Sequence, residues 1–367
     1  MLNGFRVLDL TRVLAGPVCT MMLGDLGANV LKVERPGTGD ETRGWGPPFD
    51  DQGQSAYFLS VNRNKKSVAL DLDDPAGRDL LCRLIAGADV VVDNFRSGTL
   101  ERRALAPSRF LREHGRLVWC TISGFGPQSD RPGYDFVVQA ERGWMSVTGE
   151  ANGRPVKVGV ALADVVAGKD AAVAILAALV ARGQNGRGRH VVTSLGQSAA
   201  AALVNVAQNV LVTGRDAARW GNAHPNLVPY QLFDAADRPL VLAVGSDAQW
   251  CTCAEVLELS ELGEDPRLRT NAGRVTHREE VVTTIAARLR GAPAAHWLEL
   301  LDGAGVPCGV VKSVLETLRE VEASPLTGVA PSVPGSVRLP PPRLDEHGDG
   351  VRRLGWGVFE ERDALHR

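Results

Sequence analysis

One carboxylate in this sequence stands where it could act as a nucleophile. Asp164 directly precedes an alanine-rich apolar run that we predict to be a helix over residues 167–182. A helix N-terminus favours the ionised form of a carboxyl group, and a carboxylate nucleophile must be ionised. From position alone, the plainer interpretation is that Asp164 caps this helix, because helix starts select aspartate. The two roles are compatible.

Basic and amide side chains recur at the ends of predicted strands. They are Arg35 and Arg43, the segment 62–66 (Asn-Arg-Asn-Lys-Lys), Asn94 with Arg96, and Arg102. A single such side chain is usually a solvated surface charge. Ligands of open parallel sheets bind beyond the carboxyl ends of the strands, so the recurrence favours an anion site there.

The start of the chain reads as strand, helix and strand. Residues 5–10 are apolar and suit a strand, Pro17 suits a first helical turn, Gly27 suits a helix end, and residues 30–33 form the next strand. The intervening turn, residues 11–16, lacks the glycine pattern of dinucleotide-binding proteins. A nicotinamide dehydrogenase is therefore disfavoured.

Strands and helices continue to alternate along the chain. We predict further strands at residues 67–72, 89–93, 117–122 and 190–195, and further helices starting at Asp74-Pro75 and covering residues 167–182 and 197–212. This order predicts an α/β fold with a mostly parallel sheet and helices on both of its faces.

The pattern changes after Gly214. A strand pair at residues 230–234 and 239–244, followed by helical patterns, predicts a smaller α+β domain over residues 221–311. We expect residues 1–214 and 320–367 to form the large domain, which a proline-rich tail crosses. Residues 212–229 and 312–335 would link the two domains.

The composition is that of an ordinary globular protein. The chain has 367 residues, a net charge of −2, and 44% hydrophobic residues. Nothing in this balance suggests nucleic acid or an anionic membrane as a partner. There is no apolar run of about 20 residues and no signal-peptide pattern, and the six cysteines are scattered. We therefore expect reduced cysteines and a cytoplasmic protein.

Several ordered motifs resemble the CaiB/BaiF family, the class III coenzyme A transferases. They are Val7-Leu8-Asp9, Ala15-Gly16-Pro17, residues 26–30 (LGANV), Lys32-Val33-Glu34 and Gly39-Asp40, with further matches through Leu354. The resemblance implies a large Rossmann-like domain that binds coenzyme A (CoA), a smaller α+β domain, and an interlocked homodimer.

The resemblance also implies the site residues. Asp164 matches the family's nucleophile. The residues matched to CoA binding are Leu14, Ala15, Arg35, Leu70, Asp71, Leu72, Asp73, Asn94, Phe95, Arg96 and Arg102. Those matched to the acyl pocket are Tyr134, Asp135 and Gln139. No metal and no permanently bound cofactor are implied, because the CoA thioester is a co-substrate.

The implied activity is that of an acyl-CoA:carboxylate CoA-transferase. Asp164 would form first a mixed anhydride with the acyl group and then an aspartyl-CoA thioester. Leu14 stands where oxalate-specific members carry glutamine, and residues 221–225 replace their glycine run, which puts oxalate specificity in doubt.

Two alternatives remain open. Racemases of 2-methylacyl-CoA in the same family carry histidine at the position of Tyr134, and tyrosine is a poor base near neutral pH. A racemase therefore ranks second. A homologue that binds CoA without catalysis ranks third, because Asp164 is intact.

Overall fold

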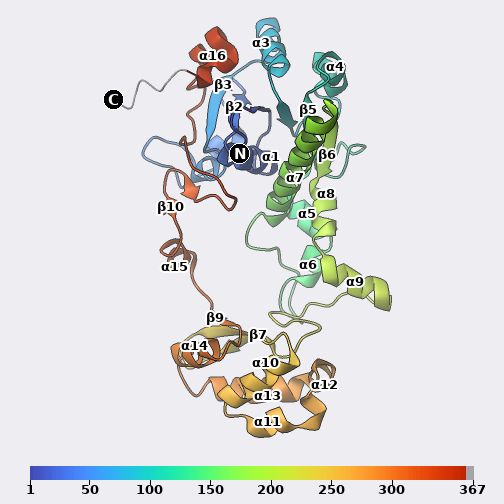
Figure 1. Ribbon diagram of the computed structural model, residues 1–367, viewed down its shortest axis with the longest axis vertical. Helices are drawn as coiled ribbons and strands as arrows, with labels where there is room; N and C mark the ends of the chain where they lie inside the picture. Colours follow the sequence, from blue (N-terminus) through green and yellow to red (C-terminus); the bar gives the residue numbers. More distant parts are fainter. Residues whose placement is uncertain (361–367) are drawn as a thin grey trace. The chain divides into compact units, whose positions relative to one another are not determined.

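The computed structural model describes residues 1–360, and the chain divides into two compact units (Figure 1). The first unit comprises Met1–Met145, Lys157–Arg215 and the chain from Val321 onward. The second comprises Ser146–Val156 and Asp216–Glu320.

The first unit is built on a six-stranded sheet in which every neighbouring pair of strands is parallel. In order across the sheet, the strands are β3 (Lys65–Ala69), β2 (Asn29–Glu34), β1 (Arg6–Asp9), β4 (Val90–Asp93), β5 (Val118–Ser123) and β6 (His190–Ser194). The predicted α/β class with a parallel sheet is confirmed.

Helices cover this sheet on both faces. The helices that lie wholly in this unit are α1 (Ala15–Asp25), α2 (Ala56–Leu59), α3 (Pro75–Ala86), α4 (Pro107–Glu113), α5 (Asp135–Glu141), α7 (Leu162–Asn185), α8 (Leu195–Ala201), α9 (Val204–Thr213) and α16 (Gly348–Leu354). Helix α6 (Trp144–Val147) straddles the unit boundary, and 3₁₀ turns lie at η1 (Glu41–Gly44), η2 (Glu101–Arg103) and η4 (Gly355–Phe359).

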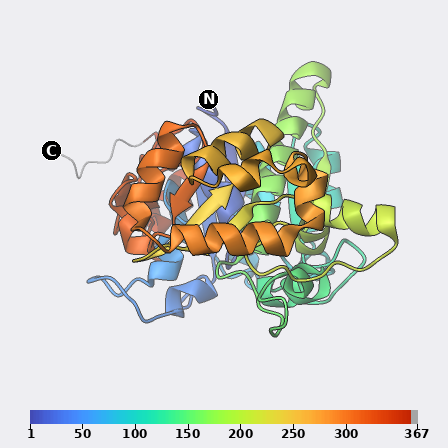
Figure 2. The same ribbon diagram turned by 90° about the horizontal axis from the view of Figure 1, so that it is seen from below.

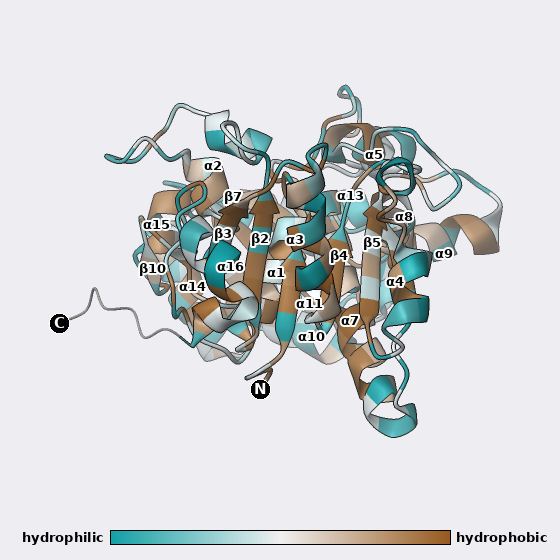
Figure 3. Ribbon diagram, turned by 90° about the horizontal axis from the view of Figure 1, so that it is seen from above, coloured by the Kyte–Doolittle hydropathy of each residue, from teal (hydrophilic) through white to brown (hydrophobic). Residues whose placement is uncertain are grey.

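Alternate strand residues supply two hydrophobic cores. Val7, Val90 and Val118 point to the side covered by α1 and α7, while Leu8 and Val91 point to the side covered by α3 and α16. The strands are accordingly mostly brown in the hydropathy colouring of Figure 3, whereas α3 and α4 carry hydrophilic residues on the outside. Both faces are buried because a parallel sheet needs crossover helices on each side.

Helix boundaries follow local signals where these exist. Asp74 is the N-cap of α3, accepting from the N–H of Gly77, and Pro75 is its first residue, as predicted. Gly186, at φ 73°, ends α7.

Three element predictions need correction. The helix predicted from residue 167 begins at Leu162, because a distant carboxylate described below caps it. The helix predicted over residues 197–212 is two helices, α8 and α9, bent by 68°. The strand predicted at residues 67–72 is β3 at Lys65–Ala69, so Leu70 to Asp73 lie beyond its end.

The chain after Val321 lies on the first unit through buried contacts. Arg63 donates to the carbonyl oxygens of Thr327 and Val329, near the hairpin of β10 (Ala323–Ser324) and β11 (Gly328–Val329). The side-chain oxygen of Asn64 accepts from the N–H groups of Arg338 and Leu339. Internal polar groups thus hold the tail in place.

The second unit contains a small antiparallel sheet with helices around it, seen from below in Figure 2. Its strands are β7 (Tyr230–Asp234), β8 (Pro239–Ala243) and β9 (Cys308–Val310). Its helices are α10 (Asp247–Val256), α11 (Ser260–Glu264), α12 (Asn271–Thr276), α13 (Arg278–Leu289), α14 (Ala294–Gly303) and α15 (Val314–Leu318), with a 3₁₀ turn, η3 (Pro266–Leu268). Trp250 and Trp297 are fully buried in its core.

Within residues 1–360, no single helix combines the length and the apolar composition that a membrane span requires. The bent pair α8 and α9 meets that test only when the two helices are taken together, by length and composition alone.

Candidate active site

Two clefts open in the first unit where its strands end. The first has a volume of about 460 Å³, and its lining includes Leu14, Ala15, Asn94, Tyr134 and Asp164. The second, of about 240 Å³, is lined in part by Arg35 and residues 70–73. Arg12, Phe95, Arg96 and Leu100 line both, so the clefts adjoin. Most of the sequence-predicted site residues therefore meet at one edge of the sheet.

Asp164 lies in the first turn of α7 but does not cap it. The N-cap position is Ala161, and no side chain caps the helix from there, so the capping interpretation of Asp164 is wrong. Asp164 is 8% exposed, and its carboxyl group has no hydrogen-bonding partner within residues 1–360. Burial, and then the nearby charge of Asp135, raise the pKa of Asp164 to about 7.

Asp135 and Gln139 hold the start of α7. Asp135 accepts from the N–H of Ala163 (N to Oδ1 2.8 Å) and from the side chain of Gln139 (Nε2 to Oδ2 2.7 Å). Gln139 in turn accepts from the N–H of Val158. Neither side chain is among those that line the two clefts. They support the helix that carries Asp164, whereas Tyr134, 55% exposed, lines the first cleft.

The start of α1 lies against α7 beside Asp164. A Cβ atom at Gly168, one turn after Asp164, would stand 2.5 Å from the carbonyl oxygen of Ala15, so this approach requires glycine. The backbone N–H groups of Leu14 and Ala15 have no partner in the described part of the chain, and both residues line the first cleft. Unpaired donors and a buried carboxylate thus share one cavity.

Asn94 makes hydrogen bonds to the backbone of the turn after β1. Its oxygen accepts from the N–H of Arg12 (3.0 Å), and its nitrogen donates to the carbonyl of Arg12 (2.7 Å). The guanidinium of Arg12 lies 5.7 Å from the ring centroid of Phe95 and pairs with Glu41. Arg12 was not among the residues predicted for the site, although it is a cation in the turn that follows β1 and lines both clefts.

Arg102 lies outside the linings of both clefts. It donates weakly to Thr99, whereas the adjacent Arg103 lines the second cleft and pairs with Asp73 at 2.9 Å. Both arginines belong to the 3₁₀ turn η2, where successive side chains point about 120° apart. No local sequence signal distinguishes which of the two faces the cleft.

The basic segment 62–66 is buried. Arg63 pairs with Asp25 (2.7 Å) and Lys65 with Asp9 (3.0 Å), and Lys66 donates to the carbonyl of Val358. We therefore do not assign this segment to phosphate binding.

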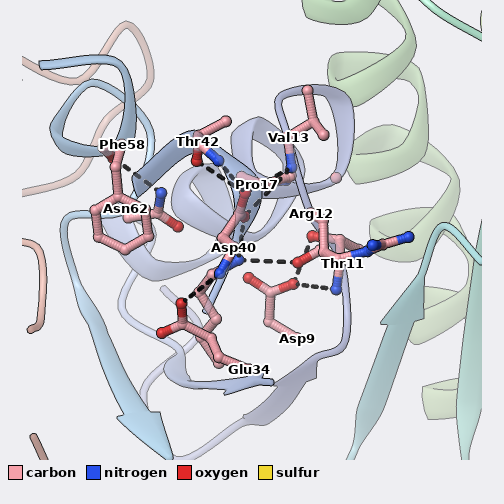
Figure 4. Close-up of polar contacts among 12 residues, drawn as sticks. Asp9, Thr11, Arg12, Val13, Pro17, Glu34, Asp40, Thr42, Phe58 and Asn62 are labelled. Atoms are coloured by element: carbon pink, nitrogen blue, oxygen red, sulfur yellow. Dashed lines mark hydrogen bonds and ion pairs between the residues drawn. The ribbon is translucent and has the colours of Figure 1, made fainter. Parts of the chain in front are cut away.

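Beneath the turn at residues 11–15 lies a buried network of charges (Figure 4). The pairs Lys65–Asp9 and Lys32–Asp40, each at 3.0 Å, have fully buried side chains, and Lys32 also donates to the carbonyl of Thr11. Burial lowers the pKa of Lys65 to about 8, an effect that Asp9 partly opposes. Through Lys32, the network is hydrogen-bonded to the backbone of this turn.

The chain is similar to known proteins over nearly its whole length. A family model described as CoA-transferase family III matches residues 2–330. The chain therefore belongs to this family. The family predicted from the sequence motifs is confirmed.

Particular relatives agree with this assignment. The succinyl-CoA:glutarate CoA-transferase of Mus musculus is 42% identical, over 94% of this chain and 84% of that protein. The acetyl-CoA:oxalate CoA-transferase of Acetobacter aceti is 35% identical, over 100% of this chain and 94% of that protein. The crystal structure of a CaiB/BaiF family protein from Brucella suis has a TM-score of 0.83 and 36% identity, covering 96% of this chain and 98% of that one.

Proposed function

We propose that Asp164 is the nucleophile of an acyl-CoA:carboxylate CoA-transferase reaction. The observation that carries this role is a buried carboxyl group without a hydrogen-bonding partner in the described chain, set in the cleft at the strand ends. A carboxyl held in this way retains nucleophilicity that a hydrogen-bonded or solvated one would lose.

The reaction balances without water, metal or a net proton. The Asp164 carboxylate attacks the thioester carbonyl, the C–S bond breaks, and CoA thiolate leaves a mixed anhydride. The thiolate then attacks the aspartyl carbonyl of that anhydride and expels the donor acid, giving an aspartyl-CoA thioester. The acceptor carboxylate attacks this thioester and releases the thiolate again. The thiolate finally attacks the acceptor's carbonyl, which frees Asp164.

Each attack places negative charge on a carbonyl oxygen, which needs donors. The N–H groups of Leu14 and Ala15 are the donors that we propose, because they are unpaired in the described chain and line the cleft of Asp164. Donors fixed by a helix start need no reorganisation when charge develops.

CoA would occupy both clefts. We place the adenine end in the second cleft, near Arg35 and residues 70–73, with Asn94, Phe95 and Arg96 at the junction and the thioester in the first cleft. Leu70 and Leu72 offer an apolar surface, and the arginines offer charge for phosphates.

Replacing Arg96 should weaken CoA binding more than replacing Arg102. Arg96 lines both clefts, so Arg96→Ala should raise the KM for acyl-CoA about 10-fold, the loss of one charged phosphate contact. Arg102→Ala, the matched control, should change it by about 2-fold or less, because this side chain lies outside both linings. Steady-state kinetics of both variants measure the KM for acyl-CoA. A rise in KM for Arg102→Ala that equals or exceeds the rise for Arg96→Ala would contradict this placement of CoA.

The substrates that we propose are small dicarboxylic acids. The relatives named above act, by their names, on succinyl-CoA and glutarate or on acetyl-CoA and oxalate. Succinyl-CoA with glutarate is the first pair to test, because the relative of that name has the higher identity. The second acid also needs a place, and Arg131 is one cation in the lining of the first cleft.

Transfer from succinyl-CoA to glutarate should depend on a single ionisation near neutrality. The carboxylate is the reacting form, and burial with the charge of Asp135 raises the pKa of Asp164 to about 7. The kcat/KM for acyl-CoA should therefore rise about tenfold per pH unit below about 7 and level off above it. Chromatography of the CoA thioesters formed measures the rate.

The variant Asp135→Asn tests the cause of that ionisation. Asparagine can still accept from Ala163 but carries no charge, so the acidic limb of the profile should move to lower pH. If the acidic limb does not move, burial alone accounts for the raised pKa of Asp164. Formation of no new thioester with any acid of a dicarboxylate panel would contradict the proposed function.

The arrangement around Tyr134 gives no support to the racemase alternative. Racemisation needs a base on each face of the α-carbon, yet both oxygens of Asp135 are occupied by Ala163 and Gln139. Tyr134 alone supplies no second base near neutral pH.

We further propose a cytoplasmic homodimer, interlocked as the resemblance implies, in which residues 1–214 and 320–367 form a Rossmann-like CoA-binding domain. Helix α9 supports a dimer, because Leu211 and Val212 are 76% and 75% exposed on one protomer. Apolar side chains exposed to this extent commonly mark protein interfaces.

A further inference from the structure

Val13 has a backbone conformation that valine rarely adopts. Its φ is 70°, in the left-handed region, where a β-branched side chain is a true outlier. Such strain persists only where surrounding contacts impose it, and it gathers at functional sites. Val13 lines the first cleft, immediately before Leu14 and Ala15, whose N–H groups have no partner among residues 1–360.

Asp40 holds the backbone of Val13 by hydrogen bonds. The N–H of Val13 donates to both oxygens of this carboxylate, at 3.2 and 3.3 Å (Figure 4). Asp40 also accepts from Lys32 at 3.0 Å, and from the N–H and hydroxyl of Thr42 at 3.0 and 2.8 Å. Its 1% exposure leaves it no room to move toward solvent.

The carboxylate stays charged in this setting. Burial alone would raise the pKa of Asp40, but Lys32 and the Thr42 N–H outweigh burial, so the pKa is lowered. Lys32 in turn holds the carbonyl of Thr11, and Asp40 holds the N–H of Val13. These two backbone groups flank Arg12.

The plainer role of Asp40 is to cap the short 3₁₀ turn η1, which its contacts to Thr42 accomplish. That role does not require the contact to Val13, which lies 27 residues earlier. Nor does it explain why a valine occupies a position that glycine or asparagine would take without strain.

We propose that Asp40 is a positioning residue for CoA transfer: it holds Val13 in the left-handed conformation and so sets the N–H groups of Leu14 and Ala15 against the carbonyl that Asp164 attacks. This inference rests on the transfer function proposed above. Asp40 acts through the turn and does not itself meet the substrate. Its loss should therefore change kcat more than the KM for acyl-CoA.

The test compares the purified full-length wild type with Asp40→Asn in the succinyl-CoA to glutarate assay, with the melting temperature of each protein. Asparagine keeps the shape but loses the charge and one acceptor oxygen for Val13. We expect kcat to fall by 10- to 100-fold, on the order of the effect of misplacing a catalytic group by 1 Å, with KM within about 3-fold.

A rescue variant separates positioning from stability. Glycine adopts φ 70° without strain, so the double variant Val13→Gly/Asp40→Asn should regain roughly 10-fold of the lost kcat without regaining melting temperature. The matched control is Thr42→Val, which removes a hydrogen bond from the same carboxylate but leaves Val13 held. Its kcat should equal that of the wild type.

If Asp40→Asn does not fold, the same contact can be removed from the other side. Replacing the N–H of Val13 by an ester oxygen, by incorporation of the corresponding hydroxy acid, leaves the Asp40–Lys32 pair intact and should lower kcat similarly. A wild-type kcat in folded Asp40→Asn or in the ester protein would overturn the positioning role. Absence of transfer by the wild type would overturn the proposed function itself.

Discussion

Replacing Asp164 with alanine should abolish CoA transfer, with kcat reduced about 10⁴-fold or more, as expected when a covalent nucleophile is removed. The protein should remain folded and be no less stable. Asp164 has no hydrogen-bonding partner among residues 1–360, and burial raises its pKa to about 7, so no native bond is lost with it. Steady-state kinetics and a melting curve measure both effects.

Asp170 provides the control for this prediction. It lies on the same helix, is exposed, and accepts from Ser198 outside the cleft lining. Asp170→Ala should leave kcat close to that of the wild type. If Asp164→Ala retained more than about a hundredth of wild-type kcat, another group would have to be the nucleophile.

Replacing Lys65 with methionine should destabilise the fold by about 3–5 kcal/mol, because it leaves the fully buried carboxylate of Asp9 without its direct partner. Asp9 would keep its bonds from Thr11 and Thr20, but these are uncharged donors. Denaturant unfolding, followed as the change in midpoint at constant slope, measures the loss.

The same substitution at an exposed pair is the matched control. Lys312 pairs with Glu320, and both side chains are about half exposed, so Lys312→Met should cost about 1 kcal/mol or less. Equal costs at the two sites would contradict the structural role given to the buried network. Restoring charge balance with Asp9→Asn should recover part of the loss in Lys65→Met.

The architecture of the first unit follows from short-range patterns. Apolar runs separated by helical spacing predicted the parallel sheet, and Asp74-Pro75 marked the start of α3 to the residue. These signals act between neighbours in sequence, so they can be read without a structure. The start of α7 could not be read this way, because its cap is Asp135, 28 residues before Ala163.

The location of the site was predictable from the sequence, but the role of each side chain was less so. Asp164 and most CoA-binding candidates meet at one edge of the sheet. Among the candidates, Arg35, residues 70–73 and Asn94 lie just beyond strand ends. Asp135 and Gln139, matched to the acyl pocket, instead support α7. The direction in which a side chain points depends on tertiary contacts that a motif does not record.

Charge alone was the least reliable signal. Residues 62–66 look like an anion site in the sequence, yet Arg63 and Lys65 face buried aspartates that lie 38 and 56 residues earlier. A basic residue is exposed unless a partner is buried with it, and such partners cannot be identified from local sequence. The Asp40–Val13 contact escaped prediction for the same reason.

The most direct test of the account is intact-protein mass spectrometry after brief incubation with succinyl-CoA, with hydroxylamine or borohydride added to trap the acyl and CoA adducts. We expect a covalent adduct on the wild type that peptide mapping places on Asp164, and none on Asp164→Ala. Transfer to glutarate without any adduct at Asp164, or an adduct mapped to another residue, would contradict the covalent role of this carboxylate.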